Sequence, residues 1–99
     1  MNNRYLEKLR QLMLSVLEGE RVRVILFGSR ARQDNRVTSD VDIGLIHDEE
    51  LNRKKIVLLR EKVEDLNIPY KVEIVDFAFV SEVFKKEALK GAVVWKDWN

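Results

Sequence analysis

Two aspartates, Asp40 and Asp42, lie on either side of Val41 near the middle of the chain. Residues at i and i+2 of a strand point to the same face, so the two carboxylates would lie side by side. Each raises the pKa of the other unless a cation lies between them. Mg²⁺ is the natural candidate, because it prefers oxygen ligands and commonly uses one or two carboxylates together with substrate phosphates. The alternative is an acidic strand end without function, and taken alone the Asp-x-Asp pair favours that alternative.

A group of residues that could bind phosphate precedes this pair. Gly28 directly follows an apolar, β-branched run, and a glycine there allows a backbone conformation in which N–H groups face an anion. Ser29 adds a hydroxyl donor, and Arg30 and Arg32 add positive charge. If a helical turn begins here, its N-terminus also favours phosphate. The alternative is a plain turn followed by a solvated basic loop.

The two groups are more informative together than apart. Gly28 and Ser29 directly follow one expected strand, and Asp40 and Asp42 lie at the start of the next. The polar loop 30–39 joins the two groups. Phosphoryl transfer depends on positioning and charge neutralisation more than on covalent chemistry by the protein. A phosphate cradle beside a metal-binding carboxylate pair supplies both. The sequence therefore predicts a site for metal-assisted phosphoryl transfer.

The hydrophobic pattern predicts the elements that must hold these residues. Apolar residues recur at helical spacing in two long segments, and β-branched runs indicate strands. The expected helix starts are Asn2 or Asn3, Asn52 or a neighbour, and Ser81. The predicted order is helix 5–18, strand 22–27, loop 30–39, strand 41–46, helix 52–66, strand 71–77, helix 81–89 and strand 92–95.

Within the second predicted strand, alternation separates a core face from a functional face. Val41, Ile43 and Leu45 are expected to face the core. Asp40, Asp42 and Gly44 share the other face, where Gly44 would leave room for something to approach the backbone.

Length and composition narrow the class of protein. A chain of 99 residues predicts one small domain, 1–99, with its active site on an open face. Lys and Arg (18) nearly balance Asp and Glu (17), which disfavours a general nucleic-acid coat. The sequence has no cysteine for disulfides or thiolate metal sites, and no apolar run that resembles a membrane span or a signal core. We therefore expect a soluble cytoplasmic protein. One set of arginines is expected to cluster around the phosphate loop: Arg21, Arg23, Arg30, Arg32 and Arg36.

The spacing of the two groups resembles a known family signature. Gly28-Ser29, ten intervening residues and Asp40-Val41-Asp42 are similar to the Gly-Ser-x10-Asp-x-Asp motif of the polymerase-beta-like nucleotidyltransferase superfamily. The strings from Gly28 to Arg32 and from Ser39 to Asp42 look like its minimal (MNT) branch. The resemblance covers most of the chain and implies an α/β (α+β) fold, with a mixed sheet of about four strands flanked by helices. It also implies that Gly28 and Ser29 bind NTP phosphates and that Asp40 and Asp42 bind magnesium.

The family takes a third carboxylate from a neighbouring strand, which here contains Glu73 and Asp76. Glu73 falls where the family usually has aspartate, so we choose it as the third metal ligand and as the base for the acceptor hydroxyl. Strand alternation agrees, because Glu73 lies on the opposite face from Val72 and Ile74, whereas Asp76 lies on their side and nearer the strand end. The chain departs from the family pattern at Glu73, one methylene longer than aspartate, and at Gln33, where a second glycine is common.

The resemblance implies a magnesium-dependent enzyme that transfers a nucleoside monophosphate, AMP from ATP or its equivalent from another NTP, to an acceptor hydroxyl. Minimal members of the family are often paired with an all-helical HEPN protein in toxin–antitoxin systems. The chain is therefore expected to modify such a toxin and to act as an antitoxin. The alternatives are an antitoxin that acts by contact alone, without catalysis, and an enzyme that transfers the nucleotide to tRNA or to a small molecule such as an aminoglycoside. Nucleic acid enters only as an acceptor.

Apolar side chains outside the predicted core favour an assembly. Leu14, Leu58 and Trp98 exceed what the helices and strands need to bury, so we expect a helical partner or a homodimer. Trp95 is expected to pack onto the sheet. His47 is the one histidine in the sequence, and we expect it to be solvated at a strand end rather than catalytic.

Overall fold

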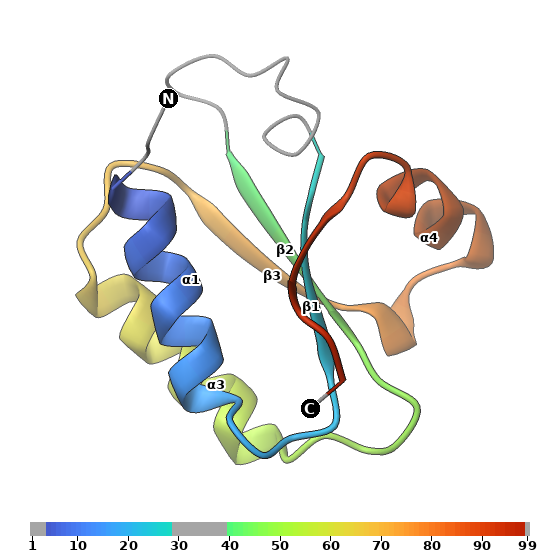
Figure 1. The fold of residues 1–99 in the computed structure, drawn as a ribbon, viewed down its shortest axis with the longest axis horizontal. Coiled ribbons are helices and arrows are strands. Elements are labelled where there is room, and N and C mark those ends of the chain that lie inside the picture. Colours follow the sequence, from blue (N-terminus) through green and yellow to red (C-terminus); the bar gives the residue numbers. More distant parts are fainter. Residues whose placement is uncertain (1–3, 29–39, 99) are drawn as a thin grey trace.

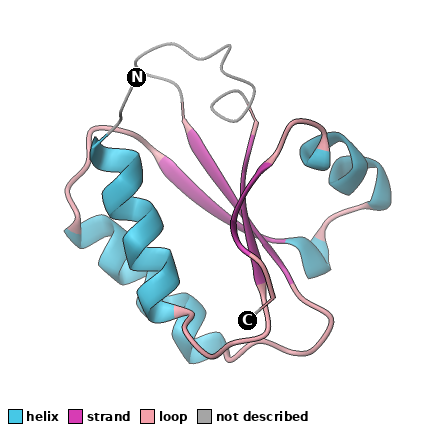
Figure 2. Cartoon of the chain, viewed as in Figure 1, coloured by secondary structure: helices cyan, strands magenta, loops and turns pink. Residues whose placement is uncertain are grey.

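The computed structural model describes residues 4–28 and 40–98, and these residues form three layers (Figure 1). Helices α1 (Arg4–Val16) and α3 (Arg53–Asp65) cover one face of a sheet, whereas the 3-10 helix η1 (Phe77–Phe79) and α4 (Glu82–Leu89) cover the other. The sheet consists of β1 (Arg23–Phe27), β2 (Val41–Ile46), β3 (Val72–Asp76) and β4 (Val93–Lys96). The predicted helices and strands all form and follow the predicted order (Figure 2).

The strands of the sheet run in both directions. Their order is β3-β2-β1-β4. β1 is antiparallel to both β2 and β4, whereas β2 and β3 are parallel. A parallel pair needs a long crossover connection, which α3 provides. The expected fold class, an α/β protein with a mixed four-stranded sheet, is therefore confirmed.

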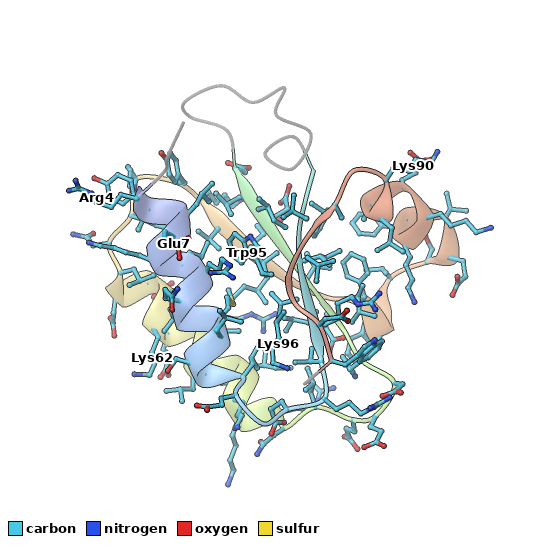
Figure 3. The ribbon with its side chains drawn as sticks, viewed as in Figure 1. Arg4, Glu7, Lys62, Lys90, Trp95 and Lys96 are labelled. Carbon is cyan, nitrogen blue, oxygen red and sulfur yellow. The ribbon has the colours of Figure 1, made fainter. Side chains whose placement is uncertain are left out.

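The main core lies between the sheet and helices α1 and α3. Leu9 and Met13, four residues apart on α1, are fully buried there, as is Leu59 of α3. They share this core with Val41, Ile43 and Leu45 of β2, so the predicted core face of that strand is confirmed. Trp95 also packs against this core, as predicted, and lies between α1 and the sheet in Figure 3.

Two helix starts follow directly from the sequence. The side chain of Asn52 accepts a hydrogen bond from the Lys54 N–H at 2.9 Å, and the Ser81 hydroxyl accepts one from the Phe84 N–H at 3.1 Å. Both predicted N-caps are confirmed, while the proposed caps of α1 at Asn2 or Asn3 lie outside the described residues. Over the ranges 4–28 and 40–98, no helix is both long enough and apolar enough to span a membrane.

A buried lysine at the end of the edge strand β4 forms hydrogen bonds to neighbouring backbone. Lys96 is 7% exposed, and its ammonium donates hydrogen bonds to the carbonyl oxygens of Glu20, Val22 and Trp98 at 2.8, 3.2 and 3.1 Å (Figure 3). Burial lowers the pKa of this amine, but three carbonyl partners compensate the loss of water. Lys96 therefore ties the end of the described chain to the turn that leads into β1.

Candidate functional site

The predicted site residues that the structure describes, Gly28, Asp40, Asp42 and Glu73, lie at one end of the sheet, where β1 ends and β2 and β3 begin. Because β1 and β2 are antiparallel, Phe27 at the end of β1 is paired with Asp42 near the start of β2. Because β2 and β3 are parallel, Asp42 is also paired with Glu73. Asp42 therefore lies between Gly28, which follows β1, and Glu73. This end of the sheet is at the top of Figure 1.

Gly28 is suited to its position for two reasons. Its φ of +78° lies in the left-handed region, which residues with a side chain rarely adopt. A Cβ atom at this position would also lie 2.6 Å from Oδ2 of Asp42, closer than real Cβ atoms approach another atom. The glycine thus lets the backbone turn and lets the Asp42 carboxylate lie against it. Any side chain at position 28 would displace that carboxylate.

The charge around Asp42 is largely negative. Partial burial, then repulsion from Glu73 and then repulsion from Asp40 raise the pKa of the Asp42 carboxyl above its usual range, and Lys71 opposes the rise. Burial and the neighbouring carboxylates thus disfavour the ionised form of Asp42. A divalent cation would offset the repulsion, and carboxylate oxygens are donors that Mg²⁺ prefers. The side chains of Asp40, Asp42 and Glu73 are therefore of the right chemical type for this metal.

Glu73, the expected third metal ligand, contacts a lysine. The Lys71 ammonium lies 3.2 Å from Oε1 of Glu73. Within residues 4–28 and 40–98, no three His, Asp or Glu side chains converge closely enough to hold a metal ion. The register thus brings Glu73 beside Asp42, while its carboxylate contacts Lys71. Sequence reasoning missed Lys71, although its position two residues before Glu73 puts both on one side of the strand.

Asp76, the alternative third carboxylate, lies at the opposite end of β3, where it is paired with Leu45. Its Oδ1 accepts a hydrogen bond from the Ala78 N–H at 2.9 Å and lies 2.7 Å from Nε2 of His47. The other ring nitrogen of His47 lies 2.6 Å from the carbonyl oxygen of Glu49. The expectation of a solvated His47 is wrong, because the parallel register brings Asp76 within reach and leaves the histidine side chain 9% exposed.

Two of the five arginines expected around the phosphate loop lie elsewhere. Arg23 begins β1 and is paired with Ile46, so it lies at the far end of the sheet from Asp42. Its guanidinium contacts Asp97 at 2.9 Å, and Arg21 contacts Asp48 at 3.2 Å. The prediction of one arginine cluster is therefore wrong for these two, because the length of β1 separates them from the loop. The remaining candidates lie outside the described residues: Ser29, Arg30, Arg32, Gln33 and Arg36.

Gly44 does leave room on the face that it shares with Asp42, but the protein itself fills that room. A Cβ at position 44 would lie 2.7 Å from Cε1 of Phe77 and 2.9 Å from Cγ1 of Ile25. Both belong to the second core, under η1 and α4. The face therefore divides in two, with carboxylates at one end and an aromatic core beyond Gly44.

Comparison with known proteins agrees with this geometry. The family model described as polymerase beta, nucleotidyltransferase matches residues 14–97. The chain belongs to this family, and the resemblance noted in the sequence is confirmed at that level. The match extends over all four strands of the sheet.

The chain is also similar to individual proteins of this kind. The chain is 32% identical over 68 residues to a probable protein adenylyltransferase, MntA, of Haemophilus influenzae. That match covers 69% of this chain but only 60% of the length of the relative. A crystal structure of a toxin–antitoxin complex with AMP-PNP has a TM-score of 0.67 at 19% identity, over 89% of this chain and 73% of that one. The tri-AMPylated HEPN toxin of Shewanella oneidensis in complex with its MNT antitoxin gives a TM-score of 0.63 at 18% identity, over 94% and 70%. These structures share the fold of this chain.

Proposed function

We propose that this chain is a magnesium-dependent nucleotidyltransferase that transfers AMP from ATP to a hydroxyl group of a helical HEPN-type toxin, and that it acts as an antitoxin in the cytoplasm. One observation supports the enzyme reading most directly: Asp42 lies against Gly28 on one side and is paired with Glu73 on the other. The similarity to a probable protein adenylyltransferase favours a protein as the acceptor, and the HEPN complexes of similar fold favour a helical one.

The residues of the proposed site would bind two different groups, a metal ion and a triphosphate. Asp40, Asp42 and Glu73 would hold Mg²⁺, which neutralises charge on the transferring phosphate when it is bound. Gly28 and Ser29, with Arg30 and Arg32, would hold the triphosphate through backbone N–H groups, a hydroxyl and positive charge.

Glu73 would also act as the general base. The acceptor oxygen attacks the α-phosphorus, and the bond from that phosphorus to the bridging oxygen breaks. Pyrophosphate leaves, and the hydroxyl proton passes to the Glu73 carboxylate. Glu73 is on an edge strand, so an acceptor can approach it from outside the sheet.

Asp42→Asn tests this assignment. Loss of one metal-binding carboxylate should reduce transfer from α-labelled ATP by roughly a thousandfold, since bound metals contribute several kcal/mol to the transition state. Stability should not fall. The raised pKa of Asp42 means that folding disfavours its charged form once the pH exceeds the ordinary aspartate value, and the amide removes that penalty at neutral pH. Labelling of the protein encoded by the neighbouring gene, with melting curves in parallel, gives both results.

Asp65→Asn is the matched control, because Asp65 is an exposed aspartate at the end of α3. It should transfer AMP at the wild-type rate. Transfer at that rate by Asp42→Asn would instead rule out the proposed site. If calorimetry of the unmodified protein detects no binding of any NTP in the presence of Mg²⁺, an antitoxin that acts by contact alone becomes the better proposal.

A further inference from the structure

The turn between α4 and β4 lies at the same end of the sheet as the candidate site. β4 is antiparallel to β1, and Leu26 near the end of β1 is paired with Val93 at the start of β4. Gly28 lies two residues beyond Leu26, and Lys90 lies three residues before Val93. Because the two strands run in opposite directions, the chain enters β4 beside the place where it leaves β1. Figure 3 shows Lys90 at the upper end of α4, and the site end of the sheet is at the top of Figure 1.

Helix α4 also packs over the face of the sheet that carries the Asp42 carboxylate. The ring of Phe84 on α4 meets the ring of Phe27 edge to face, with centroids 6.0 Å apart. Ala88, one turn later, is buried in the same core as Phe27. Phe27 is in turn paired with Asp42. The C-terminal half of α4 therefore borders the candidate site.

The end of α4 leaves the Lys90 side chain exposed. Gly91 has a φ of +73°, in the left-handed region that ends helices, and it turns the chain from α4 into β4. The Lys90 ammonium lies 2.9 Å from Oε1 of Glu87, and the lysine side chain is 71% exposed. An exposed ion pair of this kind contributes little free energy. The ammonium can therefore exchange Glu87 for a more strongly charged anion.

The strand order β3-β2-β1-β4 places the carboxylates and Lys90 on opposite sides of Gly28. Glu73 lies on β3 and Asp42 on β2, whereas Gly28 follows β1 and Lys90 precedes β4. In the proposed reaction the acceptor approaches Glu73 and attacks the α-phosphorus. The attacking and leaving oxygens are roughly in line, so the leaving pyrophosphate lies on the side of that phosphorus away from Glu73. That direction runs past Gly28 toward the start of β4.

We propose that Lys90 binds the β- and γ-phosphates of the nucleotide and stabilises the pyrophosphate as it leaves. This inference rests on the proposed function. The ammonium exchanges the Glu87 carboxylate for phosphate oxygens, which carry more charge and accept charge-assisted hydrogen bonds. Negative charge grows on the bridging oxygen as its bond to the α-phosphorus breaks, and a nearby cation stabilises that charge. Lys90 therefore contacts the substrate at the end away from the acceptor.

The proposal predicts a loss of affinity confined to nucleotides that carry the outer phosphates. Lys90→Met keeps most of the apolar stem and removes the ammonium. In calorimetric titrations with Mg²⁺ present, ATP should bind roughly tenfold more weakly to this variant, because a hydrogen bond to a charged group is lost, while AMP binding should stay within about twofold. The difference for ATP should shrink as salt is added, since an exposed charge is screened. The melting temperature should not change, because the replaced side chain is exposed.

Two variants serve as controls. Lys90→Arg keeps the positive charge and should bind ATP within about threefold of the unmodified protein. Lys62→Met removes an exposed lysine from the last turn of α3, on the other face of the sheet, and should leave both affinities unchanged. If Lys90 served only to stabilise the end of α4, Lys90→Met would lower the melting temperature and leave the ratio of ATP to AMP affinity unchanged.

The outcomes separate this inference from the proposed function. Unchanged ATP affinity in Lys90→Met, or an equal loss for ATP and AMP, overturns the role of Lys90 alone. A loss in Lys90→Arg as large as that in Lys90→Met overturns the role of its charge. An unmodified protein that binds no NTP in the presence of Mg²⁺ overturns both proposals. A selective loss of ATP affinity in Lys90→Met that is absent in Lys90→Arg supports contact with the outer phosphates.

Discussion

The two faces of the sheet are covered unequally. Among the described residues, thirteen buried apolar side chains form the core under α1 and α3, and five form the core under η1 and α4. On the second face, Phe79 and Val83 remain 72% and 74% exposed. The Asp42 carboxylate leaves β2 on this thinly covered face, opposite the side chains of Val41 and Ile43. The main core and the candidate site therefore lie on opposite faces of the sheet.

The division has a physical reason. In the proposed function the Asp42 carboxylate must stay open to solvent at one side, so no helix can cover it as α3 covers the other face. The second core is accordingly small and aromatic. Phe27, Phe77 and Phe84 meet edge to face, with ring centroids 5.4 to 6.0 Å apart. Such pairs add stability beyond their buried area, which helps a small core hold together.

Two adjacent leucines of α3 offer the largest test of this difference. Leu59 is fully buried in the main core, while Leu58 is 41% exposed. Leu59→Ala should lower the free energy of unfolding by about 2–5 kcal/mol, because it leaves a cavity. Leu58→Ala should cost less than about 1 kcal/mol. Urea unfolding monitored by circular dichroism measures both, and equal losses would contradict the assignment of stability to this face.

A smaller loss is expected on the other face. In Gly44→Ala the new methyl group would lie within 3 Å of Phe77 and Ile25, so side chains must shift. Overpacking of this kind costs about 1–3 kcal/mol. Phe77→Leu should restore part of that loss in the double variant, since it makes room, and the coupling between the two changes is measured by a double-mutant cycle of unfolding free energies. Strict additivity would show that the two sites do not touch.

Most of the fold could be predicted from periodicity. The sequence predicts strand β2 at its observed limits, Val41–Ile46, because a polar loop precedes it and its first residues alternate between apolar and polar. α1 ends at Val16 rather than Glu18, and β3 is one residue shorter at each end than predicted. Element ends depend on local hydrogen bonds that hydrophobic patterns do not encode.

The candidate site was harder to predict than the fold. Motif spacing pointed to Asp42 and Glu73, and the register brings them together. The contact of Lys71 with Glu73 could have been predicted from their spacing of two residues on one strand. The contact of His47 with Asp76 could not, because it depends on how two parallel strands are aligned. The prediction of surplus apolar side chains is wrong in part. Leu58 is exposed as predicted, but Trp98 is partly buried, and the guanidinium carbons of Arg21 and Arg23 lie 5.3 and 5.1 Å from its ring centroid. The exposure of Phe79 and Val83 is not predicted, because helical spacing does not show how little of the chain packs over η1 and α4.

The smallest expected effect is at the outer surface of α4. Val83→Ser exchanges a side chain that is 74% exposed, so the free energy of unfolding should change by less than about 0.5 kcal/mol. Ala88→Ser is the matched control on the same helix, because Ala88 is 8% exposed in the second core. Burying its new hydroxyl should cost about 1–3 kcal/mol. Thermal and urea unfolding of the two variants at several protein concentrations provide the comparison.

The concentration series matters as much as the variants. If α4 is the outermost layer of an isolated chain, the melting temperature of the unmodified protein is independent of concentration and Val83→Ser is nearly silent. If a second copy covers Val83, mass action makes the melting temperature rise with concentration, and Val83→Ser removes that rise. The two results exclude each other, since a side chain cannot be both 74% exposed in the working protein and buried against a neighbour. A large loss of unfolding free energy in Val83→Ser would therefore mean that another chain covers the face under η1 and α4. The two faces of the sheet would then be covered unequally only in the single subunit.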